Sequence, residues 1–334
     1  MKKLVFMIAS TVILFSGCYD MTDIEDIKTV AAICVEPGKI TYCTISTSPD
    51  EKNYGYELFC EYTEDMYEGL NNISLKTGKE ISVSHLKAVM FKKECSLDLI
   101  DSVCTSAVGG SEFHPKVMTA FTDMDFEMFF NKMTLAPDTS MYRKISNVYD
   151  DRYAAVTQCT VMELYQGLQY EGLGVNIPVF TLDSYGNITA DGICHINKDK
   201  KAFFDQNIAD TVNLLENSGK AVYFKENGHS VATKISGGKV RYNKDENHIY
   251  ISLETELTEG GKSTDSVTAE KVKQRIYSDI ILICNEKNRG YDILRLNREM
   301  LGKFISEKEY QKYKDSKGGF YNMLKNMDFD IEVK

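Results

Sequence analysis

The chain of 334 residues contains no tryptophan and only five histidines. None of these histidines has H-E-x-x-H spacing, so the helical zinc-peptidase motif is excluded. No C-x-x-C pair is present, which removes a common zinc-binding pattern, and no G-x-S-x-G nucleophile elbow occurs. Without tryptophan, an aromatic platform for sugars has little support. These absences predict a protein with no catalytic residues, no metal ligands and no cofactor.

Basic residues are also in short supply. Lysine and arginine total 39 against 49 aspartates and glutamates, which gives a formal net charge of -10 and a pI of about 5.2. Such a chain does not present a generally basic surface to nucleic acid or to an anionic membrane. We therefore expect no nucleic-acid partner.

Only one long apolar run is present, over residues 4–17, directly after Lys2 and Lys3. Its apolar part of about 13 residues is typical of a secretory signal, and it is shorter than the ~20 residues that span a bilayer. The run ends in Ser-Gly-Cys at Cys18, the small-small-Cys ending of a bacterial lipobox. We therefore expect cleavage of residues 1–17 and a diacylglycerol thioether on Cys18. The mature chain would be tethered outside the cytoplasm by lipid.

Eight further cysteines remain, and exported proteins often pair them. Most lie inside apolar runs, where cysteine behaves as a small core residue. Two alternatives stay open, namely buried free thiols and one or two disulfides. Cys34 and Cys43 are the pair that the sequence places near each other, because the turn 36–39 joins their two runs.

Cys194 and His195 are adjacent in a predicted strand. Their side chains should point to opposite faces, so they cannot pair as nucleophile and base. We interpret Cys194 as a core residue and His195 as a surface residue.

Apolar periodicity predicts a mixture of helices and strands. Helices are expected over residues 61–75, 96–108, from about 125, 156–168, 205–217, 266–285 and 307–314. Strands are expected over residues 27–35, 39–47, 86–91, 117–121, 188–196, 221–224, 230–235, 240–243, 248–257 and 329–333. The first helix should bury a stripe that begins at Tyr62 and continues through Met66, Leu70 and Ile73.

The order of these elements has no regular βαβ rhythm, which favours the α+β class: several domains of mixed sheets with helices packed on them, preceded by a cleaved lipoprotein signal peptide. Loop-rich sequence over 172–178 and 183–186 indicates a boundary. The expected division is a signal peptide 1–17, a lipidated tether 18–26, an N-terminal domain 27–182 and a C-terminal domain 187–334, with 187–260 and 261–334 as candidate subdomains.

Three segments in this order resemble the C subunit of spore germinant receptors, the Ger(x)C lipoprotein family. They are Cys18-Tyr19-Asp20 before the first strand, His85-Leu86-Lys87 at the strand 86–91, and Gly290-Tyr291-Asp292-Ile293-Leu294-Arg295-Leu296 after the long helix. The family has Cys-Trp-Asp, His-Leu-Lys and Gly-Ala-Asp-Ile-Leu-Gly at these places, so Tyr19 replaces a Trp and Arg295 replaces a Gly. The resemblance implies that the motif residues are structural, and Asp292, next to apolar residues, should accept backbone N–H groups.

The resemblance further implies a non-enzymatic lipoprotein on the outer face of the spore inner membrane. There it would join a membrane-embedded A subunit and a transporter-like B subunit in nutrient-triggered germination, and Cys18 would hold it to the bilayer. A solute-binding lipoprotein of an importer shares the lipobox and is the alternative. That class has two lobes built from repeated βαβ units, which the sequence pattern lacks. An exported enzyme is a third alternative.

Overall fold

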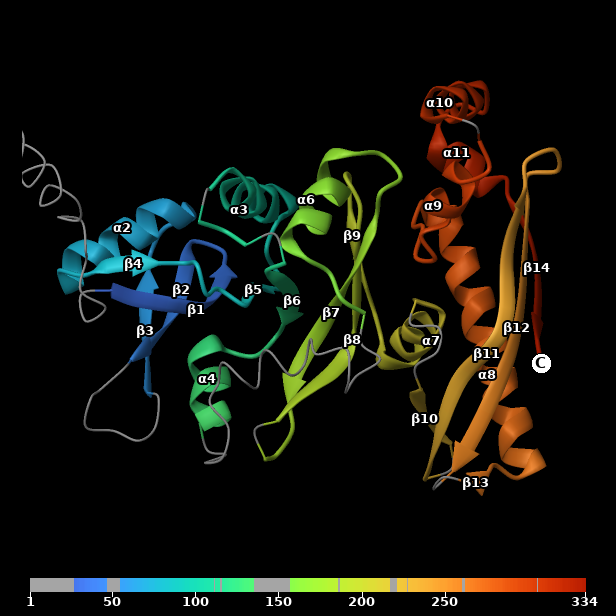
Figure 1. The fold of residues 1–334 in the computed structure, drawn as a ribbon, viewed down its shortest axis with the longest axis horizontal. Helices are drawn as coiled ribbons and strands as arrows, with labels where there is room; N and C mark the ends of the chain where they lie inside the picture. The colour runs from blue at the N-terminus through green and yellow to red at the C-terminus, as the bar shows by residue number, and fades with distance from the viewer. Residues whose placement is uncertain are drawn as a thin grey trace, which may run out of the picture.

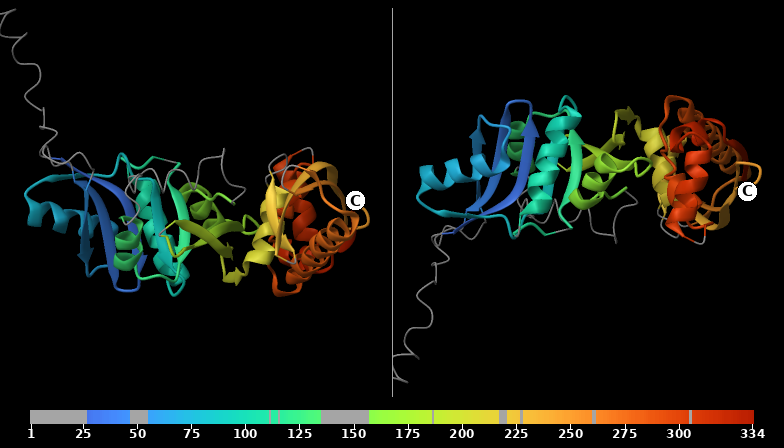
Figure 2. Two further views of the ribbon diagram at one scale, coloured as in Figure 1. Left: turned by 90° about the horizontal axis from the view of Figure 1, so that it is seen from below. Right: turned by 90° about the horizontal axis from the view of Figure 1, so that it is seen from above.

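The structure is a computed structural model that describes residues 27–46, 55–134, 157–216 and 221–334, apart from 111, 115, 186, 227, 260, 261 and 305. Two sheets follow one another along the longest axis of the molecule (Figures 1 and 2). The mixed sheets with packed helices confirm the α+β class.

The first sheet has nine strands in the order β3-β2-β1-β5-β6-β7-β8-β9, with β4 paired to β1. Its central strands β1, β5, β6 and β7 are parallel, and both ends are antiparallel. The strands are β1 (Ile27–Glu36), β2 (Lys39–Ser46), β3 (Gly55–Glu61), β4 (Glu80–Ser82), β5 (Ala88–Lys92), β6 (Met118–Thr122), β7 (Val175–Leu182), β8 (Ile188–Ile196) and β9 (Lys201–Phe204). The parallel centre is a short βαβ-like segment that the sequence pattern did not reveal.

Helices cover both faces of this sheet, as a parallel sheet requires. One face packs on α2 (Met66–Thr77), α3 (Leu97–Gly109) and α6 (Val161–Gln169), and the other packs on α4 (Phe126–Thr134). Alternate residues of β1 therefore enter different cores, with Ile33 on the first face and Cys34 on the second.

Helix α2 begins later than the apolar stripe predicts. Asp65 is its N-cap and accepts the backbone N–H groups of Tyr67 and Glu68, so the helix starts at Met66. Tyr62 precedes the helix and is 86% exposed, so its predicted inward position is wrong. The rest of the stripe is buried as predicted.

A glycine in α2 makes room for a buried tyrosine of β2. Tyr42 is fully buried and donates its hydroxyl to the carbonyl oxygen of Met66 at 2.7 Å. A Cβ added at Gly69 would lie 2.8 Å from Cζ of Tyr42. Gly69→Ala is therefore expected to lower the free energy of unfolding by about 1–3 kcal/mol through overpacking, although alanine is the better helix former.

Denaturant unfolding checks this expectation, with Gly109→Ala as the matched control. Gly109 ends α3, and nothing lies within 4 Å of its added Cβ. The control should cost nothing and can gain about 0.4–1 kcal/mol. Equal effects at the two glycines would contradict the role assigned to Tyr42.

The cysteines of the described residues are all free thiols, and seven of the eight are buried. Cys34 and Cys43 lie on the neighbouring strands β1 and β2, and burial raises the pKa of both thiols well above the usual range. The structure thus favours buried free thiols over disulfides. Cys60 is the one exposed thiol among these eight.

The second sheet has five strands, with β10-β11-β12-β13 in order and β14 parallel to β12. These are β10 (Val222–Glu226), β11 (His229–Asn243), β12 (His248–Glu259), β13 (Lys262–Ser263) and β14 (Asp328–Val333). The sequence predicts two strands, 230–235 and 240–243, where the structure has the single strand β11. The first predicted strand ends at the β-bulge between Ile235 and Gly237, which interrupts the strand pattern in the sequence but not the strand itself. Helix α8 (Ser266–Asn285) covers one face through Val272, Ile276 and Ile280.

Short helices complete the second unit. They are α9 (Leu296–Leu301), α10 (Glu307–Ser316) and α11 (Phe320–Lys325), with a 3-10 turn η2 (Glu286–Arg289) after α8. Phe320, Met323 and Leu324 of α11 enter the same core as α8.

The structure places the end of the first sheet later than the expected boundary. Strands β7 and β8 form an antiparallel hairpin, so the expected boundary falls between two paired strands and β8 and β9 belong to the first sheet. Residues 172–178, expected as loop, include the start of β7. The loop was predicted because Pro178 is disfavoured inside a strand. Strand pairing also crosses the expected subdomain limit at 260/261, since β12 pairs with β13 and β14. We propose that the two domains meet instead at α7 (Gln206–Glu216), which lies between the sheets (Figure 1).

Candidate functional site

The predicted motif residues fall in different parts of the molecule. Cys18, Tyr19 and Asp20 lie outside the described residues. His85 is exposed in the turn between β4 and β5. Lys87 donates its backbone N–H to Ala31 at 3.0 Å and accepts that of Met118 at 3.0 Å. The His-Leu-Lys segment therefore joins the backbone of β1 to that of β6.

The Gly290–Leu296 segment lies at the junction of the two sheets, after η2. Gly290 ends η2 with φ 76°, a left-handed conformation that glycine adopts without cost. Asp292 is buried, and its two carboxylate oxygens accept the backbone N–H groups of Leu296 at 2.8 Å and Asn297 at 3.0 Å. These bonds begin α9 and are the pairing that the sequence predicts for this carboxylate.

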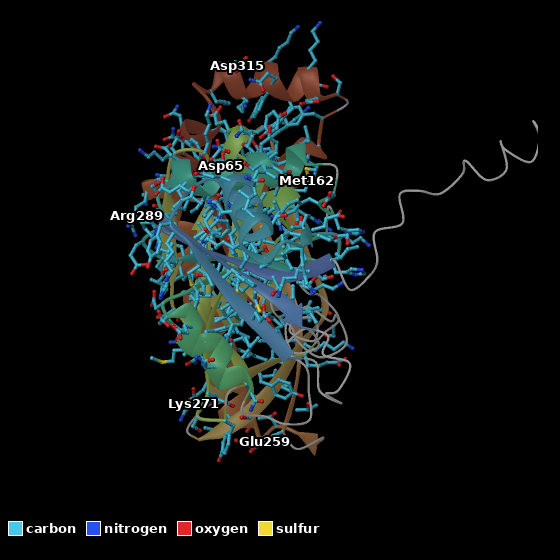
Figure 3. All side chains as sticks on the ribbon, turned by 90° about the vertical axis from the view of Figure 1, so that its left-hand side faces the viewer. Asp65, Met162, Glu259, Lys271, Arg289 and Asp315 are labelled. Carbon is cyan, nitrogen blue, oxygen red and sulfur yellow. The ribbon has the colours of Figure 1, made fainter. Side chains whose placement is uncertain are left out.

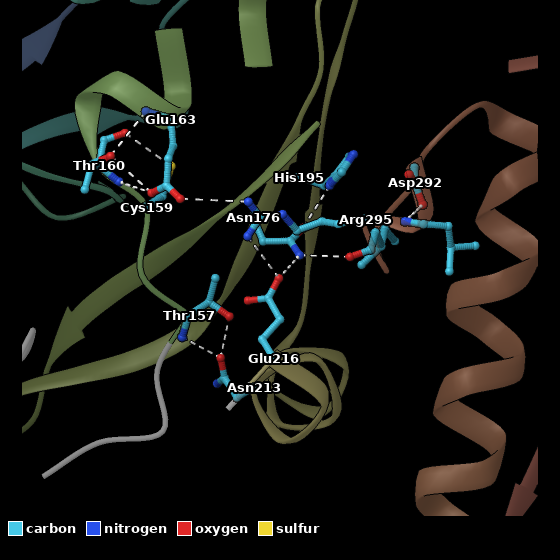
Figure 4. A network of polar contacts seen from close by, with 12 residues as sticks. Thr157, Cys159, Thr160, Glu163, Asn176, His195, Asn213, Glu216, Asp292 and Arg295 are labelled. Atoms are coloured by element: carbon cyan, nitrogen blue, oxygen red, sulfur yellow. Dashed lines mark hydrogen bonds and ion pairs between the residues drawn. The ribbon is translucent and has the colours of Figure 1, made fainter. Parts of the chain in front are cut away.

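Asn176 of β7 is the centre of a buried polar network (Figure 4). Its Nδ2 donates to Oε1 of Glu216 and to the carbonyl oxygen of Ile293, both at 2.9 Å. Its Oδ1 lies 2.8 Å from Nδ1 of His195. Since the amide nitrogen is fully used as a donor, Nδ1 of His195 must carry the proton. One side chain thus connects β7, β8, α7 and the Gly290–Leu296 segment.

His195 is fully buried, which corrects the expected surface position. The second face of β8 is covered here because Tyr291 packs edge-on against the ring, with centroids 5.9 Å apart. Burial, together with the positive charges of Arg295 and Lys200, lowers the pKa of His195 to about 3, so the ring is neutral at physiological pH. A Cβ at Gly174 would lie 2.6 Å from Nε2, so glycine is needed there.

Arg295 adds two ion pairs to this network. Its guanidinium lies 3.7 Å from a carboxylate oxygen of Glu216 on α7 and 3.9 Å from one of Glu163 on α6. Its backbone has φ 55°, a left-handed conformation that residues other than glycine rarely adopt. The glycine that the resembling family segment has at this position would adopt the same conformation without cost.

An apolar layer continues the junction beside the polar network. It consists of Ile193 of β8, Ile208, Ala209 and Val212 of α7, Ile283 of α8, Tyr291 and Ile293. The hydroxyl of Tyr291 also donates to the carbonyl oxygen of Lys201 at 3.2 Å. The arrangement is suited to fixing two sheets in one relative position.

Sequence reasoning missed Asn176, Glu216 and the pairing role of Arg295. The available signal was a single amide within the apolar run that starts at Val175, because buried polar residues are uncommon and need partners. Within the ranges that the structure covers, no cluster of His, Cys, Asp or Glu could hold a metal ion.

Comparison with known proteins decides the family. Residues 20–182 match the family model described as Spore germination protein N-terminal domain. The chain belongs to the Ger(x)C family of spore germination proteins. The match ends at Leu182, the last residue of β7, so Asn176 lies inside it. The junction partners His195, Glu216 and the Gly290–Leu296 segment of this Ger(x)C chain lie beyond it.

One solved structure, described as "Crystal Structure of the GerBC protein", is similar at 14% sequence identity. The alignment covers 88% of this Ger(x)C chain and 91% of that chain, with a TM-score of 0.49. The curated proteins gave no match. None of the helices among the described residues is long and apolar enough to cross a membrane.

The buried carboxyl of Asp292 predicts a pH dependence of stability. Burial raises its pKa to about 6 from an ordinary value of 3.8, while the two N–H bonds and Arg295 act in the opposite direction. Between these pH values the folded chain binds more protons than the unfolded chain, so the contribution of this group to stability is largest near pH 4 and is lost as pH rises to about 6. Asp292→Asn is expected to reduce the slope by the part that this carboxyl contributes, while Asp210, whose pKa burial also raises to about 6, keeps its own part.

Thermal unfolding from pH 4 to 7 measures the slope. Asp315→Asn on the exposed side of α10 is the control and should leave it unchanged. An identical pH profile for wild type and Asp292→Asn would contradict the assignment.

Proposed function

We propose that the chain is a lipid-anchored, non-catalytic C subunit of a nutrient germinant receptor on the outer face of the spore inner membrane. The observation that carries the proposal is the match of residues 20–182 to the N-terminal domain of spore germination proteins. The lipobox ending at Cys18 supports the anchor. The partners are the membrane-embedded A and B subunits.

A binding role is consistent with the geometry of the junction. The polar groups of Asn176 and His195 are buried and bond to each other, so they are not exposed to a substrate. What they provide is a fixed arrangement of two folded units. A body of fixed shape loses little freedom when it docks, and this favours tight assembly.

Lipid and partners would act together to hold the subunit. A diacylglyceryl group has two acyl chains, which together anchor a protein far more stably than one chain. Docking to membrane-embedded subunits adds a further contact at high effective concentration.

Pull-down from detergent-solubilised spore membranes tests the proposal. The tagged chain should recover an A and a B subunit, and deletion of its gene should abolish the response to one class of nutrient while other germination routes survive. Recovery of the chain alone, together with a normal nutrient response of the deletion strain, would refute the receptor role.

A further inference from the structure

Two large apolar side chains are exposed at one end of the first sheet. Tyr62 follows β3 and is 86% exposed, and Leu75 near the end of α2 is 76% exposed, which makes it the most exposed leucine of the described residues. We call Tyr62 and Leu75 the tether-end patch. Helix α2 lies at the end of the longest axis that is remote from the second sheet (Figures 1 and 2). Figure 3 looks onto this end and labels Asp65, the N-cap of α2.

An ion pair brings the two parts of the patch together. Nζ of Lys76 lies 2.6 Å from Oε1 of Glu61 and 2.8 Å from its Oε2. Glu61 is buried at the end of β3, so the pair is held against the sheet. Because Tyr62 follows Glu61 and Leu75 precedes Lys76, the two apolar side chains flank this pair.

The patch lies close to the place where the tether joins the fold. Gly78 ends α2 in a left-handed conformation, and β4 begins two residues later. Glu80 of β4 pairs with Ile27, the first residue of β1. The rise of a helix, the reach of two residues and the spacing of paired strands place Cα of Leu75 within about 18 Å of Cα of Ile27. The tether 18–26 reaches about 30 Å when extended, which exceeds this separation.

We propose that the tether-end patch inserts into the boundary between the headgroups and the acyl chains of the bilayer, and so holds the chain with this end on the membrane. The inference rests on the proposed lipid anchor at Cys18. The anchor brings the bilayer within reach of Leu75, and at that effective concentration a small apolar contact is enough. Both residue types suit this depth, since leucine enters the acyl boundary and tyrosine is enriched at membrane interfaces.

The contact is apolar and not electrostatic. Glu61 and Lys76 neutralise each other, while Glu64 and Glu68 follow Tyr62 in the chain and add negative charge. Anionic headgroups therefore gain nothing at this end of the molecule. The patch should insert equally into neutral and anionic vesicles.

Because the chain has no tryptophan, a single introduced tryptophan reports its own surroundings. The full lipoprotein with Leu75→Trp is reconstituted into phosphatidylcholine vesicles with and without bromine on the acyl chains. Burial about 5–10 Å into the boundary should shift the emission to shorter wavelength, and bromine should remove about half of it. Leu282→Trp, at an exposed leucine of α8, is the matched control and should keep its emission on both vesicles.

Amine labelling gives a second readout that leaves the patch unaltered. Vesicles should slow the acylation of Lys76, measured by mass spectrometry, whereas Lys271, exposed on α8, should react at the same rate with and without them. Leu75→Gln should reduce the protection of Lys76 by about tenfold, the factor that the loss of one buried leucine side chain gives.

Flotation of the vesicles separates failure of the inference from failure of the anchor. A chain that floats with the vesicles, with unchanged emission from Leu75→Trp and unchanged labelling of Lys76, would overturn the inference alone. A chain that does not float would remove the anchor and the inference with it. A response that requires the A and B subunits, or that grows with protein concentration without vesicles, would assign the patch to a protein and also overturn the inference.

Discussion

Replacement of Cys18 by alanine is expected to abolish lipid attachment and to leave an uncleaved or a released chain. The thioether needs the Cys18 sulfur, and each buried methylene of an acyl chain contributes about 0.8 kcal/mol of membrane affinity. The loss therefore removes essentially all anchoring that does not come from partners. Lipid labelling and membrane fractionation of sporulating cells measure the result.

Cys60→Ala is the matched control, because Cys60 is an exposed thiol in β3. The control should be labelled and fractionate as wild type. A Cys18→Ala chain that is processed normally and stays in the membrane fraction would show that the lipobox has been misread.

The second large effect is expected at Asn176. Asn176→Ala leaves the carbonyl oxygen of Ile293 and Nδ1 of His195 without their buried partner, while Oε1 of Glu216 keeps its ion pair with Arg295. Unpaired buried groups cost about 1–3 kcal/mol each when no water replaces the partner. We expect a loss of about 2–4 kcal/mol in the free energy of unfolding, measured by denaturant titration.

Asn187→Ala provides the comparison, since Asn187 makes an exposed hydrogen bond to Asp183 in the β7–β8 turn. It should cost well under 1 kcal/mol. If the two variants unfold at the same denaturant concentration, the network at Asn176 does not fix the junction.

Local signals in the sequence were sufficient for elements that are defined by their own residues. The hairpin of β1 and β2 is confirmed around Pro37 and Gly38, and α8 begins and ends as predicted. The Asp265 N-cap and the apolar spacing of α8 are visible within one segment. Strand β7 was missed because glycines and Pro178 favour a loop, while its pairing with β6 comes from a distant segment.

At the junction too, the sequence predicted the residues whose partners are close in the chain and missed those whose partners are distant. Asp292 could be assigned because its partners Leu296 and Asn297 follow within five residues. Asn176 could not be assigned, because its partner Ile293 is 117 residues away. The burial of His195 was likewise invisible, since it depends on Tyr291 packing across from another unit.

The parallel pairing of β12 with β14 also fixes the order in which the chain can fold. The first sheet has all its strands once residue 204 has been synthesised. The second sheet lacks a strand until residues 328–333 have followed α8 to α11. Until then one edge of β12 has open backbone groups, which is the feature that invites pairing with another chain. The N-terminal unit can therefore mature early, whereas the C-terminal unit depends on its last strand.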